Sequence, residues 1–200
     1  MRLILLRHGY SAFNKLACLT GQFDAPLDAV GHEQAEKASE YILQNFAVDK
    51  IYSSDLCRAV NTAKPISDAL GLPIIKSAAL RELDLGKWQG MKISEVGEKY
   101  PDVYPLCVTD SSVPFGGAES YDDLIKRASV EIKRIATENN GKNVLVATHG
   151  EFIRALLFAF GYQNAKSVFD IEHITNCSVT VIDYDGEKAD FICVNKYDYM

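Results

Sequence analysis

The sequence has no cationic run, no CxxC pair and no long apolar stretch. Lysines and arginines are scattered and the net charge is −6, which disfavours nucleic acid and anionic membranes as partners. The number of cysteines, five, is odd, and this is typical of a reducing compartment and not of a disulfide scaffold. No segment approaches the ~20 apolar residues of a membrane helix. The apolar run between Arg2 and Arg7 is too short for a signal-peptide core, so we predict a cytoplasmic protein without a membrane partner.

The composition is otherwise that of an ordinary folded domain. Hydrophobic residues make up 48% and charged residues 24% of the 200 positions, a balance that allows a core of normal size. Apolar residues recur along the whole chain, and no repeat, low-complexity tract or linker interrupts them. The sequence therefore predicts one domain over residues 1–200.

Short apolar runs alternate with segments of helical periodicity. The predicted strands are residues 2–6, 50–53, 73–75 and 144–147, and residues 10–30 are a predicted loop. Helical spacing of apolar residues covers 31–46, 56–70, 92–100, 120–141 and 151–160. Pro65 is expected to kink or split the second of these helices. The alternation predicts an α/β fold, a three-layer α/β/α sandwich with a mostly parallel central sheet.

Two segments depart from this alternation. Residues 178–184 and 189–194 are predicted strands joined by Asp185-Gly186, which indicates an antiparallel hairpin at the edge of the sheet. Residues 101–119 contain Pro105, Pro114, Gly116 and Gly117. Long segments of this kind are often binding loops, so we expect a lid around 101–119.

His8 and His149 occupy equivalent positions. Each follows a predicted strand, and each precedes a glycine that lets the backbone approach a ligand closely. Ligands of open α/β sheets bind beyond the carboxyl ends of the strands, so neighbouring strands would bring both imidazoles to one crevice. The predicted helix after Gly150 offers unpaired N–H groups and a positive dipole end, which favour an anion.

Two other interpretations of these histidines exist. A histidine taken alone is more often a hydrogen-bonded core or loop residue, but the equivalent positions, and Arg7 beside His8, favour a shared site. Metal binding needs a third ligand, and no HxH or HExxH spacing is present. We therefore expect no metal.

Several blocks of the sequence form an ordered set. The first is LRHG at 6–9, and the last is ATHG at 147–150. Between them are SSDLCRA at 53–59 followed by Thr62-Ala63, LRE at 80–82 followed by Gly86, Trp88 and Gly90, and GGAES at 116–120. Asn14, Thr20-Gly21 and DAPL at 24–27 also fit. Together, from the N-terminus to about Asn176, the blocks resemble the histidine phosphatase superfamily, the RHG branch that includes the phosphoglycerate mutases.

The resemblance implies a phosphatase mechanism with defined roles. His8 would be the nucleophile that forms a phosphohistidine, which water then hydrolyses. Arg7, Arg58 and His149 would hold the non-bridging oxygens of the phosphoryl group, in place of the Mg²⁺ used by other phosphoryl-transfer enzymes. Glu82 would protonate the leaving oxygen and then activate water.

The resemblance also implies the surroundings of the substrate. Asn14 would add a neutral donor to the phosphate, and Thr20, Gly21 and Gly150 would complete the binding site. The implied partner is a small phosphorylated metabolite, with no cofactor and no metal.

Departures from the family pattern concern specificity. Mutases usually follow the acid with an Arg and a Tyr that hold a carboxylate, whereas Leu83, Asp84 and Leu85 follow Glu82 here. The chain is also short for a mutase, and both points favour a phosphatase. Tyr10 stands where the family often has Glu or Gln. Gln89 stands where phosphatase members often have Glu.

Three alternatives to a general small-molecule phosphatase remain open. The runs at 86–90 and 115–117 lean toward the α-ribazole phosphatases. A cofactor-dependent phosphoglycerate mutase would use the same nucleophile. A phospholigand-binding regulatory module is the non-enzymatic alternative, although such a module would be expected to have lost the nucleophile or the acid. No exposed apolar stripe is long enough to indicate an oligomeric state.

Overall fold

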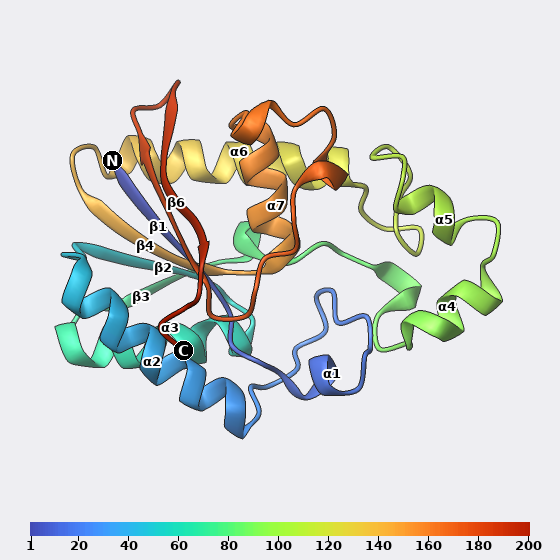
Figure 1. The fold of residues 1–200 in the computed structure, drawn as a ribbon, viewed down its shortest axis with the longest axis horizontal. Coiled ribbons are helices and arrows are strands. Elements are labelled where there is room, and N and C mark those ends of the chain that lie inside the picture. Colours follow the sequence, from blue (N-terminus) through green and yellow to red (C-terminus); the bar gives the residue numbers. More distant parts are fainter.

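A six-stranded sheet runs through the middle of the protein in the order β3-β2-β4-β1-β5-β6 (Figure 1). The computed structural model describes residues 1–200. The strands are β1 (Arg2–Arg7), β2 (Lys50–Ser54), β3 (Ile74–Ser77), β4 (Asn143–Thr148), β5 (Val179–Tyr184) and β6 (Ala189–Lys196). The first four pair in parallel, and β5 and β6 add antiparallel at one edge. This confirms the predicted α/β fold, including the hairpin at the edge of the sheet.

Helices cover both faces of the sheet, so the molecule has three layers. On one face, α2 (Ala29–Asn45) packs beside α3 (Cys57–Leu70), and on the other α6 (Tyr121–Glu138) packs beside α7 (Gly150–Ala159) (Figure 1). Successive side chains of β1 point to opposite faces of the sheet, because side chains alternate along a strand. Leu3 and Leu5 belong to the core under α6 and α7, and Ile4 and Leu6 to the core under α2 and α3.

The remaining helices are short. They are the α-helices α1 (Ala12–Lys15), α4 (Ile93–Lys99) and α5 (Tyr104–Cys107), and the 3₁₀ turns η1 (Ala78–Leu80), η2 (Gly86–Trp88), η3 (Tyr162–Asn164) and η4 (Val168–Asp170). None of the helices combines the length and hydropathy needed to cross a bilayer.

The structure differs from the sequence predictions in three local features. The predicted loop at 10–30 contains α1, whose short length leaves no periodicity to detect. The helix α2 begins at Ala29, two residues before the predicted start at 31. Its start is set by Asp28, whose side chain accepts a hydrogen bond from the Gly31 N–H. Pro65 does not split α3, which is one helix across it.

The predicted lid segment, residues 101–119, is only partly a loop. It contains α5, and together with α4 it projects from the body of the sheet (Figure 1). Trp88, which is 1% exposed, anchors the segment from below, with aromatic contacts to Tyr104 and Phe115. The end of the segment is a close backbone crossing at Gly116, which has φ +56° and where a Cβ would lie 2.0 Å from the Leu85 carbonyl oxygen.

Candidate active site

The pairing of β1 with β4 brings the two predicted histidines together. Arg7 lies opposite Thr148 in the parallel register, so the next residue of each strand, His8 and His149, emerges at the same edge. Their ring centroids are 5.1 Å apart. The two imidazoles therefore lie against each other at this edge of the sheet.

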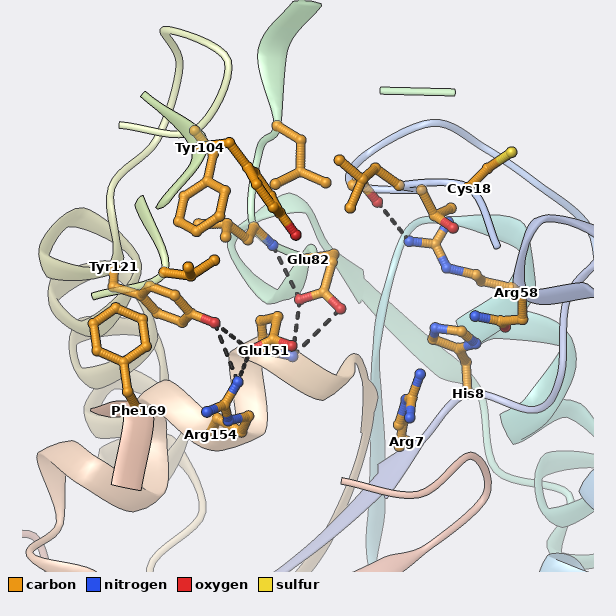
Figure 2. Close-up of a pocket in the computed structure, with 18 residues that line it drawn as sticks. Arg7, His8, Cys18, Arg58, Glu82, Tyr104, Tyr121, Glu151, Arg154 and Phe169 are labelled. Carbon is orange, nitrogen blue, oxygen red and sulfur yellow. Dashed lines mark hydrogen bonds and ion pairs between the residues drawn. The ribbon is translucent and has the colours of Figure 1, made fainter. Parts of the chain in front are cut away.

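A cavity of about 460 Å³ opens at this edge of the sheet (Figure 2). Of the predicted site residues, the cavity wall contains Arg7, His8, Asn14, Thr20, Gly21, Arg58 and Glu82. His149 and Gly150 are buried outside the wall, with His149 against the His8 ring and Gly150 beside the Arg7 guanidinium. They support the groups that face the cavity.

His8 is held as a neutral imidazole of defined tautomer. Its Nδ1 lies 2.7 Å from the Gly9 carbonyl oxygen. Because a carbonyl only accepts, Nδ1 carries the proton and Nε2 keeps its lone pair. Burial, followed by the charges of Arg58 and Arg7, lowers the pKa of His8 well below its ordinary value. An unprotonated Nε2 is the form that can act as a nucleophile.

The loop that carries His8 is held by a residue far along the chain. Asn176 donates from Nδ2 to the carbonyl oxygens of His8 and Gly9, at 3.0 and 3.3 Å. It lies outside the ordered blocks of the sequence, and no spacing rule would have singled it out.

Two buried arginines flank His8. Arg58 donates from Nη1 and Nη2 to the carbonyl oxygens of Phe23 and Gly21, at 2.8 and 2.7 Å. Arg7 donates to the Ile174 carbonyl and lies 2.9 Å from Nε2 of His173. The Nε groups of both arginines have no partner. Buried guanidinium groups with free donors and no carboxylate partner are suited to an oxyanion.

The buried His149 has no hydrogen-bond partner at either ring nitrogen. Its side chain is fully buried, and burial followed by the charge of Arg58 lowers its pKa well below the ordinary value. Orphaned buried polar atoms are rare in native proteins, and a catalytic role is one of the explanations for them.

The side chain of Glu82 lies against the N-terminus of α7. Its carboxylate accepts from the backbone N–H groups of Leu83, Glu151 and Phe152, at 3.0, 3.1 and 3.3 Å. Burial, followed by the negative charge of Glu151, raises its pKa above the ordinary value. A carboxyl group of raised pKa in a cavity is suited to general acid catalysis.

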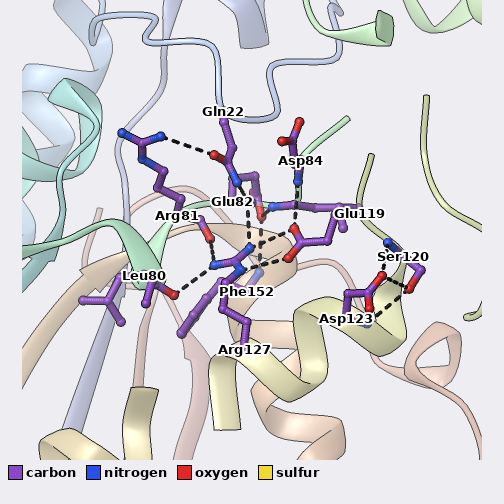
Figure 3. A network of polar contacts seen from close by, with 12 residues as sticks. Gln22, Leu80, Arg81, Glu82, Asp84, Glu119, Ser120, Asp123, Arg127 and Phe152 are labelled. Atoms are coloured by element: carbon purple, nitrogen blue, oxygen red, sulfur yellow. Dashed lines mark hydrogen bonds and ion pairs between the residues drawn. The ribbon is translucent and has the colours of Figure 1, made fainter. Parts of the chain in front are cut away.

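A half-buried ion pair, Arg127 with Glu119, holds the backbone around Glu82 (Figure 3). Arg127 donates to both carboxylate oxygens of Glu119, at 2.8 and 2.9 Å. The same guanidinium donates to the carbonyl oxygens of Ala79, Arg81 and Glu82. Sequence reasoning missed Arg127, because a single arginine in an amphipathic helix is read as an exposed residue.

Figure 2 shows that the cavity has two ends, with the Glu82 carboxyl between them. His8, Arg7 and Arg58 form one end. Tyr104, Tyr121 and Phe169 lie at the other end, where Phe115 packs against Tyr121. The apolar part of the cavity wall also includes Leu19, Leu83, Leu85 and Val108. Glu151 and Arg154 also line the cavity and are paired at 2.9 Å.

The uncharged predicted ligands lie on the loop after β1. Asn14 uses its Oδ1 to accept from the N–H and the hydroxyl of Ser11, at 3.0 and 2.9 Å, which leaves its amide N–H₂ without a protein acceptor. Thr20 and Gly21 are part of the cavity wall. No group of three or more His, Cys, Asp or Glu side chains is arranged to hold a metal ion.

Comparison with known proteins shows one consistent resemblance. Residues 3–196 match the model of the histidine phosphatase superfamily (branch 1). Phosphoglycerate mutase-like protein 4 of Arabidopsis thaliana is 34% identical, over 93% of this chain and 81% of that protein. A metal-independent phosphoserine phosphatase of the same plant is 32% identical, over 93% and 77%.

The fold is shared with a solved structure at higher coverage. A mycobacterial glucosyl-3-phosphoglycerate phosphatase, solved with VO₃, superposes with a TM-score of 0.90 and 26% identity. The match covers 98% of this chain and 99% of the other.

Proposed function

The chain belongs to the histidine phosphatase superfamily and is a phosphoric monoester hydrolase, and we propose that it dephosphorylates a small metabolite through a phosphohistidine on His8. The observation that carries this proposal is the neutral His8, with a free Nε2, flanked by two buried guanidinium groups without carboxylate partners. Phosphoryl transfer needs a positioned nucleophile and stabilisation of the negative charge, and both are provided here.

In the first step, the lone pair of His8 Nε2 forms a bond to phosphorus while the bond to the leaving oxygen breaks. Glu82 donates its proton to that oxygen, so that an alcohol leaves instead of an alkoxide. Arg7 and Arg58 neutralise the negative charge on the oxygens of the phosphoryl group. The His149 ring, which lies against His8, donates a further hydrogen bond to these oxygens.

In the second step, Glu82 is a carboxylate and takes a proton from a water molecule. The water oxygen forms a bond to phosphorus, the P–N bond breaks, and its electron pair returns to Nε2 of His8. Inorganic phosphate leaves, Glu82 is protonated again, and the site is restored.

Arg7, Arg58 and His149 would do the work that Mg²⁺ does in other phosphoryl-transfer enzymes, so the proposed reaction is metal-independent. Asn14, with its free amide, and the Thr20-Gly21 wall would complete the phosphate site, and the segment 101–119 would cover it as a lid. All five cysteines are unpaired, which supports a reducing, cytoplasmic location.

The mutase and regulatory alternatives are tested together with this proposal. A mutase would interconvert phosphoglycerates in the presence of the bisphosphate, whereas we expect net phosphate release. A regulatory module would bind phosphate without turnover, although both the nucleophile and the acid are present in this chain.

The test measures phosphate release from p-nitrophenyl phosphate and a panel of sugar, nucleoside and glycerate phosphates, with and without EDTA. We expect turnover that survives EDTA and is lost in His8→Ala, and a phosphoenzyme that is labile in acid and stable in alkali. His32→Ala, a histidine outside the cavity, is the matched control. Full activity of His8→Ala would overturn the proposal.

A further inference from the structure

The end of the cavity beyond Glu82 is where the leaving group lies in the proposed reaction. Phosphate occupies the His8 end, and Glu82 protonates the oxygen that joins phosphate to the rest of the substrate. The remainder of the substrate therefore extends toward Tyr104, Tyr121 and Phe169 (Figure 2).

This end of the cavity offers aromatic and aliphatic contacts. Four aromatic rings line it, from Tyr104, Phe115, Tyr121 and Phe169. Tyr121 packs edge-on against Phe115 and Phe169, with centroids 5.6 and 5.1 Å apart, which fixes the orientation of the rings. Rigid aromatic walls favour a flat apolar group over a small polar one.

Arg154 is the only cation at this end, and it is already paired. Nη1 donates to Glu151 at 2.9 Å and to the Tyr121 hydroxyl at 3.3 Å. Nε and Nη2 donate to the carbonyl oxygens of Ile171 and Val168, at 3.0 and 3.3 Å. All three nitrogens of this guanidinium thus have protein acceptors.

A carboxylate on the leaving group would meet no free positive charge here. Glu151, whose Oε2 also accepts from the Tyr121 hydroxyl at 2.6 Å, would repel it, and the rings of Tyr104 and Phe169 would surround it with largely apolar surface. Burying an unpaired carboxylate beside a like charge is strongly unfavourable.

From this geometry we infer that the preferred substrate is a phosphate ester of an uncharged alcohol that carries an aromatic ring, and that carboxylate-bearing phosphates are selected against. The inference rests on the proposed function, because it assigns the leaving group of that reaction.

The first experiment compares kcat/KM for 2-phenylethyl phosphate, 3-phosphoglycerate and glycerol 1-phosphate. All three are esters of primary alcohols, so their intrinsic reactivities are similar. We expect the phenylethyl ester to exceed 3-phosphoglycerate by about 100-fold, the scale of discrimination that a mismatched pocket produces. Glycerol 1-phosphate, which is uncharged beyond the phosphate and lacks a ring, should fall between them.

Variants of the aromatic wall test the ring contact. Tyr104→Ala and Phe169→Ala should lower the phenylethyl-to-glycerol ratio of kcat/KM by about tenfold, the value of a lost aromatic contact. Leu106→Ala is the matched control, because Leu106 lies on α5 with Tyr104 but is 52% exposed and outside the cavity. It should leave the ratio unchanged.

A variant of the ion pair tests the exclusion of carboxylates. Glu151→Gln keeps an acceptor for Tyr121 but releases the charge of Arg154, so the ratio of 3-phosphoglycerate to phenylethyl phosphate should rise by about tenfold. Any change in rate that Glu151→Gln causes through Glu82 affects both substrates, so it cancels in this ratio of kcat/KM values.

The outcomes separate this inference from the proposed function. Turnover that depends on His8 and favours 3-phosphoglycerate, or ratios that ignore all three cavity variants, would overturn the inference and leave the phosphatase in place. Absence of His8-dependent turnover on every ester would overturn both. The predicted ranking, with the predicted shifts in the variants, would establish the inference.

Discussion

At the scale of single residues, the surroundings shift the pKa of His8 and the pKa of Glu82 in opposite directions. Burial and two arginines keep the imidazole of His8 neutral, while burial and Glu151 keep the carboxyl of Glu82 protonated to higher pH. The proposed first step needs both of these forms at once, an unprotonated base and a protonated acid. The shifts in pKa therefore favour the reactive combination.

We expect Glu82→Gln to reduce kcat for glycerol 1-phosphate by about 10²–10⁴, the usual contribution of a general acid. In the wild type, kcat should fall as the pH rises through the raised pKa of Glu82, because deprotonation removes the acid. The variant should lose this dependence, and pH profiles of kcat for both proteins measure it.

Leaving-group chemistry provides the control for this prediction. p-Nitrophenolate leaves without a proton, so Glu82→Gln should slow the first step, the transfer of the phosphoryl group to His8, much less with p-nitrophenyl phosphate than with glycerol 1-phosphate. Single-turnover kinetics measure this step apart from the hydrolysis of the phosphohistidine, in which Glu82 is the base for both esters. Equal losses in the rate of this first step on the two esters would show that Glu82 does not act as the acid.

At the scale of elements, α6 supports the site through a residue that lies outside the cavity. Arg127 on this helix binds Glu119, at the end of the 101–119 segment, and the carbonyl oxygens around Glu82. The pair thus links residues 101–119 to the backbone around Glu82. A displacement of about 1 Å can cost 10²-fold in rate, so this link affects catalysis through position.

Arg127→Met should lower kcat by roughly 10–100-fold with a smaller change in KM, because Glu82 is displaced while the phosphate site remains. It should also lower the free energy of unfolding, since Glu119 is left half-buried without its partner. Steady-state kinetics and urea unfolding measure the two effects.

Arg134→Met is the matched control for Arg127→Met. Arg134 lies on the same helix and pairs with Glu131 and Glu138, but it is more exposed and does not reach the backbone of Glu82. Equal kcat losses in the two variants would contradict a positioning role for Arg127. Addition of Glu119→Gln to Arg127→Met should restore part of the stability but not kcat.

The elements differ in how far the sequence predicted them. The central strands are continuous apolar runs of a length that suits buried strands, and their positions were confirmed. The helix α1 and the helix α5 have four residues each, too few for periodicity to appear, so both regions were predicted as loops.

At the scale of the whole molecule, the sheet separates two apolar cores. Ile132 of α6 is fully buried in the core under α6 and α7, whereas Val130 of the same helix is 62% exposed. The helix that carries Arg127 therefore depends on this core for its placement.

Ile132→Ala should reduce the free energy of unfolding by roughly 2–5 kcal/mol, because it removes buried methyl groups and leaves a cavity. Val130→Ala should change it by no more than about 0.5 kcal/mol. Urea unfolding followed by far-UV circular dichroism compares the two. Similar losses of unfolding free energy in Ile132→Ala and Val130→Ala would contradict the conclusion that α6 is stabilised by packing against this core.

The sequence by itself determined the strand-and-helix order and the chemical identity of His8, Glu82 and the arginines, because these follow from local periodicity and from motifs of contiguous residues. Only the tertiary structure decided which groups meet. The contact of His173 with Arg7, the support of the His8 loop by Asn176 and the pairing of Arg154 with Glu151 depend on packing. A side chain acquires its tautomer, its pKa and its free donors from neighbours that the folded backbone brings to it.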